Sequence, residues 1–266
     1  MNSRGLSLAL IVLTGIVPSA KLWGEQRTPP AIGCSKKVAF RVSEVVGWST
    51  PAGGSAFFYT SGLAVDADGA YRAYHPGNNG LDSLTHAGYP GNWWALATDD
   101  DTKTGNPVVQ GPSDPAPGYY VSTTALYDRK NRNPRDPRRY VDAATVPYIV
   151  LPPRGLRYAR LGDFATVINL RNGKISGAIV ADESQELPDR IGEGSMALAK
   201  ALGIDPDPRE GGQDDGRVVY LVYPGSGNGA PRSVAEIARN SQSLFERWGG
   251  MAKIRGCVVD SSPHRK

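Results

Sequence analysis

Two acidic residues, Asp182 and Glu193, stand at the two ends of one polar loop. Asp182 ends the apolar run "ISGAIVAD", and Glu193 lies between two glycines at the start of the apolar helical pattern "SMALAKALGI". Burial at a strand end raises the pKa of a carboxyl group, whereas a helix N-terminus favours its ionised form. Such contrasting environments can separate a general acid from a general base. A purely structural interpretation gives the same pattern: Glu193 would cap the helix and Asp182 would be a solvated strand end. The spacing alone leaves both the catalytic and the structural interpretation open.

The segments that would position these acids are mostly strands. "GDFATVINL" and "ISGAIVAD" read as a hairpin joined at Asn172-Gly173, and "RVVYLVYPGSGNG" reads as a further buried strand. Apolar residues recur at helical spacing in residues 194–203 and 233–248. Long loops rich in glycine and proline fill the remainder, with Gly 32, Pro 21 and only 21% charged residues. This pattern predicts a mainly β (α+β) fold with two attached helices.

Six sequence blocks, spread over roughly residues 55–228, can be compared with a known family. They are "LAVDADGAYRAYH", "GYYVSTTAL", "YVDAATVPYIVLP", "GDFATVINLRNGKISGAIVAD", "IGEGSMALAKALGI" and "VVYLVYPGSG". Together they resemble glycoside hydrolase family 75, the fungal-type chitosanases and their bacterial relatives. The most specific part runs from the Gly-Asp strand through the hairpin to "IGEGSMALAKALG". The resemblance implies that Asp182 and Glu193 are the catalytic pair.

The resemblance also implies a fold and a reaction. The expected core is a double-psi-like β-barrel, which is shared with expansin-like domains. The expected reaction is endo cleavage of β-1,4 bonds in chitosan with inversion, with Glu193 as general acid and Asp182 as general base, although these two roles can be exchanged. Asp66 and Asp68, in "VDADG", are implied to contact the substrate. The loop "ESQELPDR" departs from the family pattern by carrying extra acids, among them Glu183.

The chemistry of the residues agrees with this resemblance. Glycoside hydrolysis needs one carboxyl group to protonate the leaving oxygen and another to activate water or attack the sugar. Chitosan is a polycation in acid, and an acidic cleft would attract it although the formal net charge of the chain is +4. Trp94 and Tyr120, from the pairs Trp93-Trp94 and Tyr119-Tyr120, could offer flat faces to sugar rings. The other member of each pair is expected in the core.

The N-terminus predicts export. A positively charged "MNSR" precedes an uncharged apolar run from Gly5 to Val17, which is shorter than the ~20 residues of a membrane span. We expect a signal peptide within residues 1–24, a single catalytic domain over 25–266, and an extracellular or periplasmic monomer without stable membrane association. An uncleaved signal anchor is the alternative. Cys34 and Cys257, an isolated pair in an exported chain, predict one disulfide.

Other patterns predict no further ligand. The dispersed cysteines and histidines have no metal-ligand spacing, so neither a metal nor a cofactor is expected. The basic segment 127–140 lacks interleaved aromatic residues and reads as a solvated loop, which predicts no nucleic-acid partner. "PGSGNGA" lacks the ending of a phosphate loop and reads as a turn. Two alternative functions stay open: a glycosidase of peptidoglycan or another amino-sugar polysaccharide, and a non-catalytic, expansin-like wall-binding module.

Overall fold

The computed structural model describes residues 33–50, 55–184 and 190–259. The chain divides into two units, residues 1–30 and 31–266, and every described residue belongs to the second. The predicted signal peptide, 1–24, lies outside the described residues, as do two acids of the "ESQELPDR" loop, Glu186 and Asp189. Among the helices of the described ranges, none is both long and apolar enough to cross a membrane.

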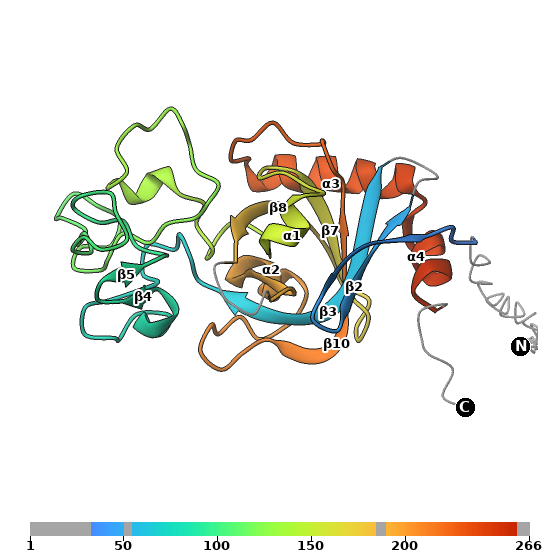
Figure 1. The fold of residues 1–266 in the computed structure, drawn as a ribbon, viewed down its shortest axis with the longest axis horizontal. Coiled ribbons are helices and arrows are strands. Elements are labelled where there is room, and N and C mark those ends of the chain that lie inside the picture. Colours follow the sequence, from blue (N-terminus) through green and yellow to red (C-terminus); the bar gives the residue numbers. More distant parts are fainter. Residues whose placement is uncertain (1–32, 51–54, 185–189, 260–266) are drawn as a thin grey trace, which may run out of the picture. The chain divides into compact units, whose positions relative to one another are not determined.

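Six strands close into a β-barrel (Figure 1). Around the barrel their order is β3, β10, β7, β8, β6 and β9, and β9 pairs again with β3. The pairs β3–β9 and β6–β8 are parallel, and the other four pairs are antiparallel. The mainly β barrel predicted from the sequence is therefore confirmed. The barrel strands are β3 (Ala56–Asp66), β6 (Tyr148–Leu151), β7 (Phe164–Asn169), β8 (Ile175–Glu183), β9 (Glu193–Ser195) and β10 (Gln213–Val222).

Alternation of side chains along the strands produces two apolar clusters, because neighbouring residues point to opposite faces. In β3, Phe57 joins one cluster and Phe58 the other; in β10, Tyr220 and Val219 divide in the same way. Every residue of β6 and β7 is buried. Both faces of the sheet are therefore covered, which explains why these strands read as continuous apolar runs rather than alternating ones.

The predicted hairpin between β7 and β8 turns at Asn172-Gly173. Gly173 has a φ of 73°, a left-handed conformation that glycine adopts without steric cost. Its N–H donates to the carbonyl oxygen of Asn169 at 2.8 Å. The turn fixes the register in which β8 returns along β7, and this register brings the end of β8 to the site described below.

Within residues 33–50, 55–184 and 190–259, four helices accompany the barrel. The two expected from the sequence are α2 (Met196–Ala201) and α3 (Val234–Trp248), and α3 begins with a capping box made by Ser233 and Glu236. Figure 1 shows α3 lying over β7 and β8. This close packing depends on Gly177 of β8, where a Cβ atom would stand 2.8 Å from the Cβ of Ser241. The structure adds α1 (Pro153–Leu156) and α4 (Gly250–Val259).

A disulfide joins α4 to the chain just before β1. Cys34 and Cys257 form the bond, with 4.9 Å between their Cα atoms, so the predicted pairing is confirmed. The hairpin of β1 and β2 extends the sheet beyond β3, and long loops with short elements lie between β3 and β6. The elements outside the barrel are β1 (Lys37–Val42), β2 (Val45–Thr50), β4 (Gly88–Tyr89), β5 (Asn92–Trp93) and the 3-10 turns η1 (Leu84–His86) and η2 (Pro137–Arg139).

Candidate active site

Asp182 and Glu193 lie in one row across the barrel wall. Val150 of β6 is the lateral partner of both: it pairs with Asp182 of β8 on one side and with Glu193 of β9 on the other. Ala64 of β3 continues the row beyond Glu193. Lateral partners in a sheet direct their side chains to the same face. All four residues accordingly line one cleft of 360 Å³.

A β-bulge directs Asp182 into this cleft. Ile149 lies opposite Val180, but the next residue, Val150, lies opposite Asp182. Ala181 is therefore an extra residue in β8, and such an insertion re-aims the side chains that follow it. Without the bulge, Val150 would pair with Ala181 and Asp182 would point to the opposite face of the sheet.

The segment at residues 125–126 is bound directly to the bulge. The carbonyl oxygen of Ala181 accepts a hydrogen bond from the N–H of Leu126 at 2.8 Å. Oδ1 of Asp182 accepts two more, from the N–H of Ala125 at 2.9 Å and from that of Glu183 at 2.8 Å. These bonds fix the carboxyl group in one orientation and make Ala125 part of the cleft rim.

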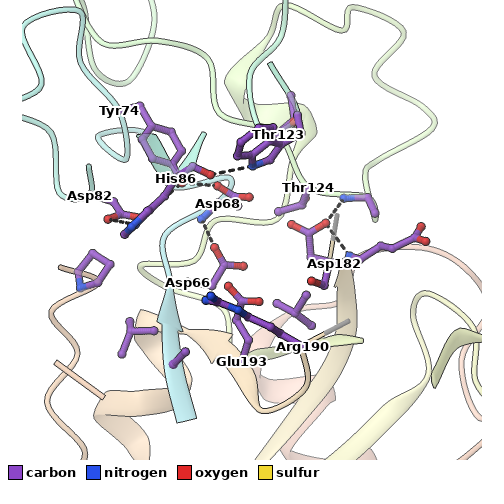
Figure 2. Close-up of a pocket in the computed structure, with 18 of the residues that line it drawn as sticks. Asp66, Asp68, Tyr74, Asp82, His86, Thr123, Thr124, Asp182, Arg190 and Glu193 are labelled. Carbon is purple, nitrogen blue, oxygen red and sulfur yellow. Dashed lines mark hydrogen bonds and ion pairs between the residues drawn. The ribbon is translucent and has the colours of Figure 1, made fainter. Parts of the chain in front are cut away.

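Asp66 and Asp68 lie in the same cleft, at the end of β3. Oδ1 of Asp66 accepts the N–H of Asp68 at 2.8 Å, and Oδ2 accepts the hydroxyl of Tyr148 at 2.8 Å. The hydroxyl of Tyr74 donates to Oδ1 of Asp68 at 2.6 Å. One carboxylate oxygen from each of Asp66, Asp68 and Asp182 lies within 4.8 Å of the others. Figure 2 shows Glu193 beside Asp66, with Arg190 next to both.

Burial and, after it, the close approach of these carboxyl groups raise their pKa values. Burial, the largest cause, raises the pKa of Asp66 from 3.8 to about 6, against the hydrogen bonds from Asp68 and Tyr148. Burial and the charges of Asp66 and Asp182 hold the pKa of Asp68 well above its usual value. The pKa of Asp182 is also raised well above 3.8, by burial first and by Asp66 second. The burial of Asp182 therefore agrees with the raised pKa expected for an acid at a strand end.

The cleft also contains residues that the sequence did not single out. Asp82, which is buried, contacts Nδ1 of His86 at 2.8 Å, and the carbonyl oxygen of Asp82 accepts from Arg209. The only sequence pattern that could have linked Asp82 with His86 is their four-residue spacing, which brings side chains together on a helix. The segment is rich in loop-forming residues, so this spacing did not predict a contact. Further lining residues are Val65, Tyr74, Trp94, Lys103, Thr123, Thr124, Glu183, Ser184, Arg190 and Pro208.

The two aromatic residues predicted to bind sugar differ in position. Trp94 lines the cleft, and its indole N–H donates to the carbonyl oxygen of His86 at 2.8 Å. Tyr120 packs against the hydrophobic core, and its backbone N–H donates to the carbonyl oxygen of Tyr74. Tyr120 is not among the described residues that line the cleft. Its contact with substrate stays a prediction without geometric support, whereas Trp94 is placed where a sugar ring could stack.

The three clustered carboxylates raise the question of a metal. Oxygen ligands from several carboxylates are what Mg²⁺ and Ca²⁺ prefer, and the oxygens of Asp66, Asp68 and Asp182 are close enough to share one ion. The dispersed Cys and His residues had predicted no metal site. The spacing of these oxygens does not by itself identify an ion, so we assign no metal to them and derive no step from one.

Comparison with known proteins identifies the family of the chain. Residues 118–251 match the family model described as the fungal chitosanase of glycosyl hydrolase group 75, which is half of the chain. The chain belongs to glycoside hydrolase family 75. It is therefore a chitosanase-like glycoside hydrolase, as the sequence blocks predicted. A search of curated proteins found no match. The part matched by family 75 contains Asp182 and Glu193 but begins after Asp66 and Asp68, which only the fold brings to the same cleft.

Proposed function

We propose that this chain is a secreted, endo-acting glycoside hydrolase that cleaves β-1,4 bonds of chitosan with inversion, using Asp182 and Glu193. The observation that carries the proposal is the shared register of the two acids on either side of Val150. Residues 1–24 would be the signal peptide and 25–266 the catalytic domain of a monomer. The disulfide suits an oxidising compartment outside the cytosol.

Strand spacing supports inversion. Neighbouring strands lie about 4.8 Å apart, so the Cα atoms of Asp182 and Glu193, two strands apart, are separated by roughly 9.6 Å. We expect a similar separation for the two carboxyl groups. Inverting enzymes hold the two groups ~6.5–9.5 Å apart to admit water, whereas retaining enzymes hold them ~5–5.5 Å apart. The row therefore favours attack by water over attack by a carboxylate.

The electrostatics favour Asp182 as the acid, the reverse of the order preferred from the sequence. A general acid must keep its proton until the leaving oxygen takes it, and burial raises the pKa of Asp182. Asp182 would donate this proton as the bond between C1 and the glycosidic oxygen breaks. Glu193 would remove a proton from the water that attacks C1 from the opposite side. The cycle ends when Asp182 regains a proton and Glu193 loses one.

The charge of the cleft supports a cationic polymer as substrate. Six acids line it, against Lys103, Arg190 and His86 among the described residues; they are Asp66, Asp68, Asp82, Asp182, Glu183 and Glu193. A local negative potential attracts a polycation whatever the net charge of the whole protein. The cleft shares lining residues with two further hollows: Ala64, Arg190 and Glu193 also line one of these, and Ala125 lines the other. Neighbouring hollows that would hold further sugar units suit cleavage within a chain rather than at its end.

Reducing-end release from chitosan, chitin, cellulose and peptidoglycan, measured side by side, tests the substrate. Chitosan should be hydrolysed fastest. Faster hydrolysis of peptidoglycan would identify peptidoglycan, and not chitosan, as the substrate. Proton NMR of the first products should show the α anomer, since inversion of a β bond produces it. A β product would mean retention and would refute the two-strand geometry.

Substitution of the two acids tests the site. Asp182→Asn and Glu193→Gln keep the shape of the side chain but cannot transfer the proton, so each should lower kcat at least ~100-fold. Asp214→Asn, an exposed strand acid outside the cleft, is the matched control and should keep full activity. Circular dichroism should show all three variants folded. Near-normal turnover by either cleft variant would show that the substituted residue has a structural and not a catalytic role. Binding of chitosan without hydrolysis by the wild type would indicate a wall-binding module.

A further inference from the structure

One arginine, Arg209, joins two loops beside the cleft. It lies in the loop at residues 205–212, between α2 and β10, and the residue before it, Pro208, lines the cleft. Its guanidinium group binds a loop that lies 127 to 131 positions earlier in the chain. Four backbone carbonyl oxygens of that loop accept its hydrogen bonds: those of Asn78 at 3.0 Å, Gly80 at 3.2 Å, Leu81 at 3.3 Å and Asp82 at 2.9 Å.

The loop at residues 78–82 is folded so that these carbonyl oxygens meet at one point. The N–H of Leu81 donates to the carbonyl oxygen of Arg72, and that of Asp82 to the carbonyl oxygen of Ala73, both at 2.9 Å. Carbonyl groups outside helices and strands need a donor from elsewhere. A guanidinium group offers several N–H donors in a rigid fork, whereas a lysine ammonium is a compact point charge. The side chain of an arginine therefore suits this position better than that of a lysine.

The position of Arg209 in its own loop is fixed as well. Oδ1 of Asp207 accepts the backbone N–H of Arg209 at 2.8 Å. The N–H of Gly211 donates to the carbonyl oxygen of Asp207 at 2.8 Å, and that of Gly212 to the carbonyl oxygen of Asp205 at 3.0 Å. The guanidinium group thus extends from a closed turn, so its contacts restrict the loop at residues 78–82.

The restricted loop leads directly to one wall of the cleft, which we define by Asp82, His86 and Trp94. Asp82 contacts Nδ1 of His86 at 2.8 Å, as Figure 2 shows, and the carbonyl oxygen of His86 accepts the indole N–H of Trp94 at 2.8 Å. These contacts connect Arg209 to the wall in one series. The wall precedes residues 118–251, the part matched by family 75, whereas Arg209 lies within that part.

We propose that Arg209 is a positioning residue, which holds the cleft wall so that His86 and Trp94 bind one sugar unit of the substrate. This inference rests on the proposed function and deepens it. An indole ring packs on the apolar face of a sugar ring, and an imidazole ring exchanges hydrogen bonds with hydroxyl groups. Arg209 is not among the described residues that line the cleft. It acts by ordering the wall in advance, which reduces the entropy lost when the sugar binds.

Kinetics of two Arg209 variants test this role. Arg209→Lys keeps the positive charge but loses the fork, so the wall must become ordered during binding. Its KM for chitosan should rise about tenfold, which corresponds to ~1.4 kcal/mol. Its kcat should stay nearly unchanged, because the barrel strands hold the catalytic pair. Arg209→Gln should raise KM as well.

A purely electrostatic role of Arg209 predicts different results. Removal of a positive charge beside an acidic cleft should lower the KM for a cationic polymer, and a substitution that keeps the charge should leave KM unchanged. The direction of the change in Arg209→Gln therefore separates the two explanations.

A double variant tests whether Arg209 acts through the wall. Trp94→Ala should raise KM by itself. In the double variant Arg209→Lys/Trp94→Ala, KM should rise by less than the product of the two single effects, since residues that act through one contact are not additive. Arg217→Gln is the matched control. Arg217 is an exposed arginine of β10 that is not among the described residues lining the cleft, so this variant should keep the KM of the wild type.

Hydrogen exchange tests the contact without catalysis. The backbone N–H groups of Leu81 and Asp82 are hydrogen-bonded within the loop that Arg209 holds. They should exchange several-fold faster in Arg209→Lys, because local opening of this loop becomes easier. Exchange in Arg217→Gln should match the wild type, and circular dichroism should show every variant folded.

Three results would overturn the proposal. The first is a KM for Arg209→Lys that equals or lies below that of the wild type. The second is a double variant whose KM rises by the full product of the single effects. The third is unchanged hydrogen exchange at Leu81 and Asp82. If the wild type hydrolyses no chitosan, the proposed function fails. Calorimetry with a glucosamine oligomer then decides the role of Arg209 separately: weaker binding by Arg209→Lys supports it, and equal binding overturns it.

Discussion

Asp66→Asn should stabilise the protein at neutral pH and leave it nearly unchanged in acid. Asp66 is 7% exposed, and its oxygens accept from the N–H of Asp68 and the hydroxyl of Tyr148. Asparagine can keep the first bond through its carbonyl oxygen. Its amide can donate to the Tyr148 hydroxyl, which in turn can donate to the carbonyl oxygen of Asp68, 2.9 Å away. The substitution therefore removes the charge without leaving a buried polar group unpaired.

The size of the effect follows from the pKa of Asp66. Burial raises this pKa from 3.8 to about 6 in the folded state. Between these values the folded protein binds more protons than the unfolded chain, so its stability falls as pH rises. Because a tenfold difference in proton affinity corresponds to about 1.4 kcal/mol, the wild type loses about 3 kcal/mol between pH ~3 and pH ~7. The asparagine side chain of the variant does not titrate, so the variant avoids this loss.

Urea denaturation of both proteins at several pH values from 4 to 8 measures the difference. The free energy of unfolding of Asp66→Asn, minus that of the wild type, should increase with pH and level off above pH ~7. Asp99→Asn is the control. Hydrogen bonds from the side chain and backbone of Asn106 lower the pKa of the exposed Asp99 from 3.8, so its contribution to stability changes only below this pH range and the difference for Asp99→Asn should be nearly flat from pH 4 to 8. A difference for Asp66→Asn that is flat with pH would refute the raised pKa and the crowding of charge in the cleft.

Three further outcomes follow from the structure. Replacing Cys34 and Cys257 together by serine should lower the free energy of unfolding by ~2–5 kcal/mol in urea denaturation, and an unchanged midpoint would contradict a stabilising disulfide. Tyr148→Phe removes a hydrogen bond to the ionised form of Asp66 and should raise the pKa of Asp66 in a carbon-13 NMR titration; a lowered value would contradict it. Gly227→Ala places a Cβ atom 2.0 Å from a backbone oxygen and should lower the melting temperature, by the ~1–3 kcal/mol typical of overpacking, whereas an unchanged melting temperature would contradict this close contact.

Local sequence patterns predicted those features that depend on neighbours along the chain. The hairpin at Asn172-Gly173 follows from the turn residues themselves. Helix α3 follows from apolar residues that recur at helical spacing. The strand end at Asp182 was readable as well, because an apolar run that stops at a carboxylate predicts partial burial of that carboxylate. The disulfide could be inferred since the chain has only two cysteines to pair.

Features that depend on the register between distant strands were not readable. The bulge at Ala181, which turns Asp182 into the cleft, is visible only once β6 is paired with β8. The same applies to Asp82 and His86, which reach the cleft from the long loops between β3 and β6, at the short 3-10 turn η1. Loop paths of this kind follow from contacts with the barrel, and sequence periodicity does not encode them.

The sequence by itself determined the family, the mainly β architecture, the disulfide pair and the two acids at the ends of one loop. These features could be predicted because they depend on residue types and on short spacings along the chain, which determine local conformation. Only the tertiary structure decided that Asp66, Asp68 and Asp182 share one cleft, that Tyr120 lies outside it, and which pKa values burial raises. A pKa depends on every charge and on the solvent within several ångströms, and barrel closure brings those groups together from strands more than a hundred residues apart in the chain.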